Sequence, residues 1–119
     1  MITALEIVLQ HVRDVVDVTV TSRVPTNRPA TFVRVDQGTP YMPNPITETN
    51  IVFVQVYGTD LETVLGHIGA IRTYLLDLDA IDARVQGWEE TEGPHDYPDP
   101  DLSGVYRWQL SGELSFTHT

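Results

Sequence analysis

The chain has 119 residues, 41% of them hydrophobic, and a formal net charge of -10 at pH 7. A chain of this length suits one compact domain, which removes roughly two-thirds of its unfolded surface from water. With 17 acidic residues against 7 cations, the charge disfavours groove-type nucleic-acid binding, which needs clustered cations to displace counterions from phosphates. The absence of cysteine excludes disulfides, thiolate nucleophiles and zinc–thiolate sites.

No apolar run approaches the ~20 residues that a helix needs to cross a bilayer. The N-terminus also lacks the basic region, apolar core and cleavage site of a signal peptide. We therefore expect a soluble, unexported chain without a membrane partner.

Two segments have the spacing of amphipathic helices. Residues 4–16 repeat apolar side chains at helical intervals, and the same pattern follows Thr59 and runs to Leu76. Each segment begins with the sequence of a capping box, in which a hydroxyl and a carboxylate satisfy free amides of the first turn. The two boxes are Thr3 with Glu6 and Thr59 with Glu62.

Five segments have the β-branched or alternating composition of strands. We expect the first two to form a hairpin with a long loop, and the third, apolar on both faces apart from Gln55, to be central in the sheet. In the fourth, Gly87 is a candidate bulge. The segments are residues 18–22, 31–37, 51–57, 83–90 and 106–116, and the last places Tyr106, Trp108, Leu110, Leu114 and Phe116 on one face.

The order of these elements is helix, three strands, helix, two strands, or α-β-β-β-α-β-β. This order predicts a single α+β domain over residues 1–119, with a mostly antiparallel sheet covered by two helices.

Side chains that could bind a metal ion are scattered along the sequence rather than grouped. The four histidines, at 11, 67, 95 and 118, do not fall at the spacings of metal ligands, and we expect His11 and His67 on solvent-facing helix surfaces. Two acidic groups could supply oxygen ligands to a hard cation, but neither matches a known loop pattern, which favours solvated turn carboxylates. A weak cation site at a subunit boundary stays open. The groups are Asp77, Asp79 and Asp82, and Asp96, Asp99 and Asp101.

Catalytic signatures are missing from the sequence. Residues 66–71 are rich in glycine but lie inside the second helix, where their amides cannot point at a phosphate. Ser103 precedes a glycine, as in ordinary turns, and no His and acid stand around it in a suggestive order. We therefore expect no enzyme, with no catalytic, cofactor-binding or metal-binding residues and no cofactor.

Two proline-rich segments carry large apolar side chains that would be exposed to solvent unless other residues pack against them. These side chains either fold back onto the core of the same domain or are covered by a neighbouring subunit, because aromatic residues and Met are enriched at interface cores. The candidate interface residues are Tyr41, Met42 and Ile46 in residues 38–49, and Tyr97 and Leu102 in residues 91–103.

Residues 33–58 and 98–116 together resemble the tail terminator proteins of long-tailed, siphovirus-type phages of actinobacteria, and the match rests on their texture of strand, proline loop and strand. The order of elements over nearly the whole chain is also similar to the wider group of tail terminator and neck proteins. The resemblance implies a hexameric ring of identical subunits that caps the tail tube, terminates tube polymerisation and joins the tail to the head.

Its implied partners are other copies of itself, the tail tube protein and a head-completion or neck protein. Phage DNA is expected to pass through the lumen without sequence-specific binding, which the net negative charge would favour. The implied location is the tail-neck junction of the virion, after assembly in the bacterial cytoplasm. The resemblance supplies no site motif to carry over to individual residues.

Two alternatives remain at the level of sequence. A head-tail adaptor or neck protein of the same architecture would have a similar composition. A small-molecule-binding regulatory α+β domain belongs to a different class, and the proline loops with apolar tips favour the assembly protein over it.

Overall fold

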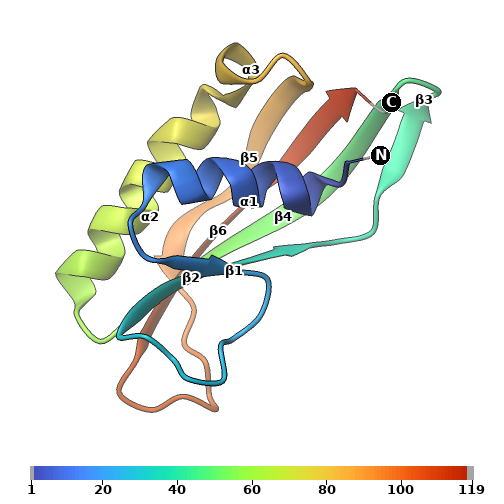
Figure 1. The fold of residues 1–119 in the computed structure, drawn as a ribbon. Helices are drawn as coiled ribbons and strands as arrows, with labels where there is room; N and C mark the ends of the chain where they lie inside the picture. The colour runs from blue at the N-terminus through green and yellow to red at the C-terminus, as the bar shows by residue number, and fades with distance from the viewer. Residues whose placement is uncertain (1, 118–119) are drawn as a thin grey trace.

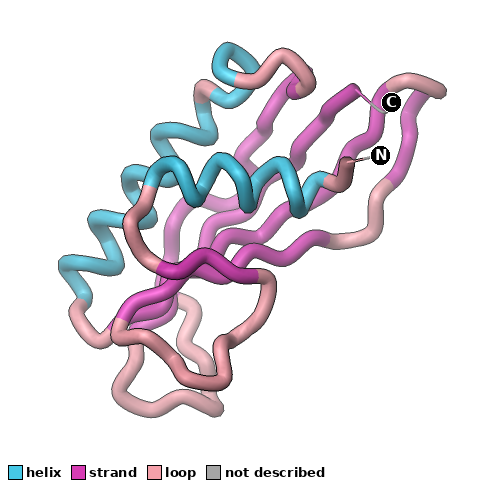
Figure 2. The backbone as a smooth tube through the Cα atoms, in the orientation of Figure 1, coloured by secondary structure: helices cyan, strands magenta, loops and turns pink. Residues whose placement is uncertain are grey.

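Six strands form one sheet along the length of the molecule, and the helices lie on one of its faces (Figure 1, Figure 2). The computed structural model describes residues 2–117. The chain is a single α+β domain with a mostly antiparallel sheet, as the sequence predicts. The helices are α1 (Ala4–Val15), α2 (Leu61–Leu76) and α3 (Leu78–Ile81), and the strands are β1 (Thr19–Thr21), β2 (Thr31–Gln37), β3 (Tyr41–Asn44), β4 (Thr47–Gly58), β5 (Val85–Asp96) and β6 (Tyr106–Thr117).

The Thr3 cap of the first box is confirmed, and the second cap is wrong by one residue. Thr3 Oγ1 accepts a hydrogen bond from the Glu6 amide at 3.1 Å, at the start of α1. In α2 the cap is Asp60, whose carboxylate accepts from the Thr63 amide at 3.1 Å. Thr59 lies one residue before this cap, and its amide donates to the Ala30 carbonyl at the end of the sheet.

A third, short helix follows α2 within the acidic turn of residues 77–82, so the expectation of two helices is incomplete. Leu78 in α3 is fully buried. The acidic turn therefore packs against the core through Leu78, and only part of it is solvent-exposed.

The strand order is β1-β2-β4-β6-β5, and β3 also pairs with β4. Every pair is antiparallel except β1 with β2, which is parallel. The expected hairpin of the first two strands is therefore wrong. A parallel pair needs a connection that returns along the strand, and the long polar loop of residues 22–30 provides one.

Residues 38–49 contain a strand, although their content of Gly, Pro and Asn argues against one in the sequence. β3 pairs with the start of β4, and Asn44 Oδ1 closes the turn between them by accepting from the amides of Ile46 at 3.0 Å and Thr47 at 2.9 Å. The Gly38 amide donates to the Ile51 carbonyl at 2.8 Å. β2 and β3 are thus consecutive partners of β4, and the prolines are tolerated because β3 lies at an edge.

The core lies between the helices and one face of the sheet. Val52, Val54 and Val56 of β4 point into it, as do Leu110, Leu114 and Phe116 of β6. Gly112 leaves space for the ring of Trp88, since a Cβ there would lie 2.3 Å from Trp88 Cζ2. Tyr106, expected on this buried face, is 45% exposed.

β5 extends six residues past its predicted end at Glu90 and runs through Pro94 to Asp96. Its pairing with β6 shifts register three times. Bulges, charges and proline are the usual means of keeping an edge strand from pairing with another sheet, and β5 is at the edge.

Candidate interaction surfaces

Over residues 2–117, no helix combines the length and apolar character that a membrane span requires. In the same part of the chain, no three acidic or histidine side chains are grouped so that they could hold a metal ion.

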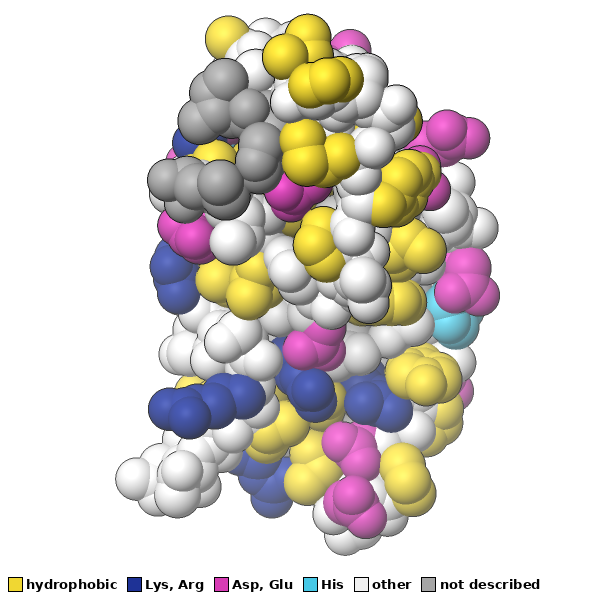
Figure 3. All heavy atoms as spheres, turned by 90° about the vertical axis from the view of Figure 1, so that its right-hand side faces the viewer, with side chains coloured by type: hydrophobic (Ala, Val, Ile, Leu, Met, Phe, Trp, Pro, Cys, Tyr) yellow, Lys and Arg dark blue, Asp and Glu magenta, His cyan; other side chains and the backbone are white. Residues whose placement is uncertain are grey.

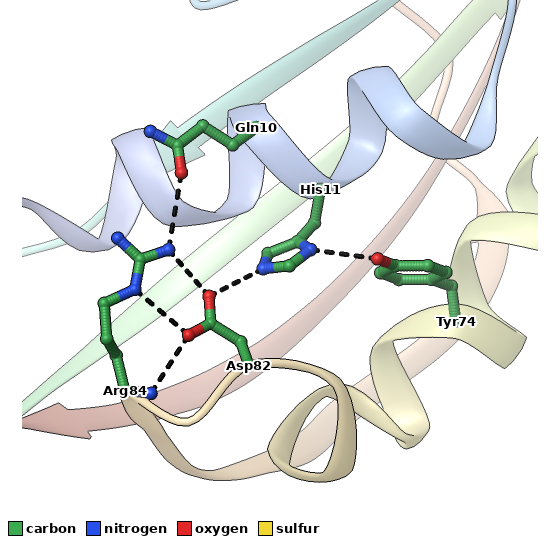
Figure 4. Close-up of polar contacts among 5 residues, drawn as sticks. All are labelled: Gln10, His11, Tyr74, Asp82 and Arg84. Atoms are coloured by element: carbon green, nitrogen blue, oxygen red, sulfur yellow. Dashed lines mark hydrogen bonds and ion pairs between the residues drawn. The ribbon is translucent and has the colours of Figure 1, made fainter.

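The most elaborate polar cluster surrounds His11 (Figure 4). Its Nδ1 lies 3.0 Å from the Tyr74 hydroxyl and its Nε2 lies 2.8 Å from Asp82 Oδ2. Arg84 donates to both oxygens of Asp82, at 3.0 Å and 2.7 Å, and reaches Gln10 at 3.4 Å. The expectation that His11 faces solvent is wrong, because its side chain is only 12% exposed.

This cluster fastens three segments to one another: α1 through His11, α2 through Tyr74, and the turn after α3 through Asp82. The Arg84 guanidinium, together with the hydrogen bond from His11, holds the pKa of Asp82 well below its usual range, although burial opposes the shift. Asp82 is thus a structural anion, not a solvated turn carboxylate. The cluster thus fastens the helices to one another.

The face of the sheet away from the helices carries a ladder of polar pairs. Thr49 bonds to Ser115 at 2.9 Å, and Gln55 bonds to Gln109 at 2.7 Å. The last two side chains are buried, at 7% and 6% exposed, although the alternation of β6 predicts a solvated face. Neighbouring side chains therefore cover one another on this face, although Gln55 Oε1 is buried without a hydrogen-bond partner.

The turn between β3 and β4 presents an apolar surface, which we call the hairpin patch: Tyr41, Met42 and Ile46. These side chains are 53%, 45% and 61% exposed, respectively. The sequence left open whether these side chains fold back onto the core of the same domain or are covered by a neighbouring subunit. Their exposure excludes the first alternative. Figure 3 shows hydrophobic side chains gathered in the upper half of this side of the molecule, over the hairpin, with Arg side chains mostly in the lower half.

Acidic side chains flank the hairpin patch. The Tyr41 hydroxyl donates to Glu113 Oε1 at 3.0 Å, and this hydrogen bond raises the pKa of Tyr41. Glu113 faces Glu89 across β5 and β6. Both carboxylates line a shallow hollow of about 360 Å³ beside Gly87.

The opposite end of the sheet has two adjoining hollows, which we call the end groove. They measure about 160 Å³ and 370 Å³ and share Thr59 and Val105 in their linings. The other lining residues are Arg28, Pro29, Ala30, Phe32, Gly104 and Tyr106. The lining of the end groove thus combines apolar side chains with polar groups, among them Thr59 and, at its border, Arg28.

The floor of the end groove is held in place by hydrogen bonds and stacked rings. The Thr59 amide donates to the Ala30 carbonyl at 3.2 Å. The ring of Phe32 stacks on Tyr57 with 4.4 Å between centroids, and the Arg107 guanidinium lies 5.7 Å from the Tyr57 ring.

Tyr97 and Leu102, the other two candidate interface residues, also lie at this end. Tyr97 is 46% exposed, and Arg107 lies 4.4 Å over its ring. Leu102 is half-buried, and its amide donates to the Asp99 carbonyl at 3.1 Å. The five candidates therefore form two groups, separated by the length of β4, instead of one surface.

Sequence reasoning missed the end groove. Its walls come from three distant segments, residues 28–32, 59 and 104–106, which only the sheet brings together. The one available signal is Val105 with Tyr106, two apolar residues directly after the turn residues Ser103 and Gly104.

No family model matches the chain, and no curated protein matches it significantly. The function is therefore argued from the surfaces alone.

Proposed function

We propose that the protein is a structural subunit of a phage tail: a tail terminator that forms a hexameric ring, caps the tail tube, ends tube polymerisation and joins the tail to the head. One observation carries the proposal. A rigid domain about 45 Å long has two unlike exposed patches at its two ends, the hairpin patch and the end groove.

Two unlike patches are what a ring subunit needs, since contacts around a ring are heterologous and each subunit must use two different surfaces. The rest of the surface supports the same role. Polar side chains on the open face pair with one another across the strands, and a net charge of -10 disfavours adhesion of DNA that passes through a lumen.

On this proposal the partners are further copies of the chain, the tail tube protein and a head-completion or neck protein. The site of action is the tail-neck junction of the virion, reached after assembly in the host cytoplasm. A head-tail adaptor of the same architecture would share the ring but would not end tube growth.

Tube polymerisation tests the proposal. Tail tube protein from a long-tailed actinobacterial phage is polymerised with and without the purified chain, and tube lengths are measured by negative-stain imaging. The chain is expected to shorten the tubes in proportion to its concentration and to appear as density on their ends.

Two results would contradict the terminator role. Tube lengths that do not change with added chain would remove it, and density on tubes that keep growing would indicate an adaptor. A variant on the exposed surface of α2, Ala70→Ser, serves as the matched control because Ala70 is far from both patches and should cap like the wild type.

A further inference from the structure

We infer that the hairpin patch of one subunit binds in the end groove of the next copy, so that the subunits join head to tail. The inference rests on the proposed function and deepens it, because it names the two surfaces that form the ring. It commits to one occupant of the groove, which is the β3–β4 turn of a second copy of this chain.

The first argument is apolar complementarity. Ile46 and Met42 project from a narrow two-stranded turn, and the end groove is a concave surface with exposed Tyr106 and half-buried Val105 in its lining. A convex apolar turn and a concave apolar groove can bury each other, and such burial contributes about 25 cal/mol per Å² of apolar surface. Neither surface is covered within its own subunit.

The second argument is charge complementarity. Arg28 borders the end groove, and Arg23 lies in the same loop. Among the described residues, neither guanidinium has an ion-pair or hydrogen-bond partner in its own subunit. Beside the hairpin patch, Glu89 and Glu113 face each other as like charges, an arrangement that a cation from another subunit would relieve.

The third argument is placement. Thr47 and Gly58 are the two ends of β4, and they pair with Thr117 and Tyr106 at opposite ends of β6. The hairpin patch and the end groove are therefore separated by about 36 Å, at ~3.3 Å per residue. A subunit cannot fill its own groove, and the contact between different patches leads to a ring or a filament, not to a two-fold dimer.

Both surfaces are also preorganised, which lowers the entropy lost on association. Asn44 closes the turn of the hairpin with two hydrogen bonds. The stack of Phe32 on Tyr57 supports the floor of the end groove.

Disulfide trapping tests the contact directly, because the chain has no cysteine of its own. Ile46→Cys places a thiol in the hairpin patch, and Thr59→Cys places one at the junction of the two hollows. Both positions are exposed, so neither change should prevent folding, which circular dichroism checks. The two single variants are mixed under mild oxidation, and the rate of dimer formation is measured on non-reducing gels.

We expect the mixture to cross-link at least tenfold faster than Ile46→Cys mixed with Ala70→Cys, the control that places a thiol on α2. Each single variant alone should stay at the control rate. The double variant, Ile46→Cys with Thr59→Cys, should give a ladder of multimers. Addition of Arg28→Glu to the Thr59→Cys chain should slow trapping several-fold without affecting the fold.

Trapping at the control rate in the mixture would overturn the inference. So would dimers of Ile46→Cys alone that form as fast as the mixture, because they would show a two-fold contact between hairpins. If the wild type caps tubes but the mixture does not trap, the terminator role stands and this contact fails. Trapping without capping would keep the contact and remove the terminator role.

Discussion

The two faces of the sheet carry different kinds of side chain. On the helix side, the strands contribute Val, Leu and Phe to a closed apolar core, and His11, Asp82 and Arg84 fasten the helices over it. On the open side, polar side chains pair with each other across the strands. Stability therefore depends mainly on one layer, and the ends of the sheet carry exposed apolar groups.

Gly112→Ala on the helix side should have the largest effect on stability. Its Cβ would lie 2.3 Å from Trp88 Cζ2, so the ring must leave its place, and the free energy of unfolding should fall by about 3 kcal/mol. Urea denaturation measures it. The matched control is Gly87→Ala in β5, where a Cβ meets nothing within 4 Å; equal losses at the two glycines would contradict the packing described for Trp88.

Asp82→Asn should lower the free energy of unfolding by about 2 kcal/mol at pH 7, because it removes the anion that Arg84 and His11 bind. The effect should depend on pH. Since the pKa of Asp82 is lowered by folding, its contribution is fully present above the unfolded carboxyl value of about 3.9 and is lost as the pH falls toward the folded pKa.

Urea denaturation of both chains at pH 7 and at progressively lower pH checks this prediction. The difference between wild type and Asp82→Asn should shrink below the unfolded carboxyl pKa. Asp101→Asn, at an exposed turn position, should cause no comparable loss at either pH. A constant difference at all pH values would show that the Asp82 charge is not the cause.

Asn50→Leu should raise the free energy of unfolding by about 1 kcal/mol. Asn50 is fully buried, and neither its Oδ1 nor its Nδ2 has a hydrogen-bond partner. A contrasting variant is Gln55→Leu on the open face, which should destabilise the chain because it leaves Gln109 without its partner. Thermal melting of both variants measures the contrast, and a less stable Asn50→Leu chain would mean that the amide has a role in the fold.

Changing Tyr41 and Met42 together to Ser should have the smallest effect on stability, within about 0.5 kcal/mol, because both side chains are exposed. It should nevertheless abolish ring formation or tube capping. Thermal melting and negative-stain imaging of the same sample separate these effects. If assembly is unaltered, the two residues are not part of the interface. If the variant is unfolded, the two side chains belong to the core.

The elements whose order follows from local periodicity could be predicted from the sequence. α1 begins after Thr3 as expected, and the three apolar side chains of β6 near its end, Leu110, Leu114 and Phe116, are buried. In these segments, most of the buried apolar residues follow the helical or strand repeat, and Tyr106 is the exception in β6.

The predictions that were wrong concern contacts between segments that are distant in the sequence. Nothing local in residues 19–37 distinguishes a hairpin from the parallel pair of β1 and β2. The proline content of residues 38–49 hid β3, which survives because it is at an edge. His11 looked solvent-exposed because its partners, Tyr74 and Asp82, are 63 and 71 residues away.

The solution mass of the purified chain, measured by light scattering at low and high concentration with negative-stain images of any large species, tests the central claim most directly. The proposal predicts a closed hexameric ring with a central lumen, formed alone or on the ends of tail tubes added to the same sample. A chain that stays monomeric at every concentration and leaves the tube ends bare would contradict it.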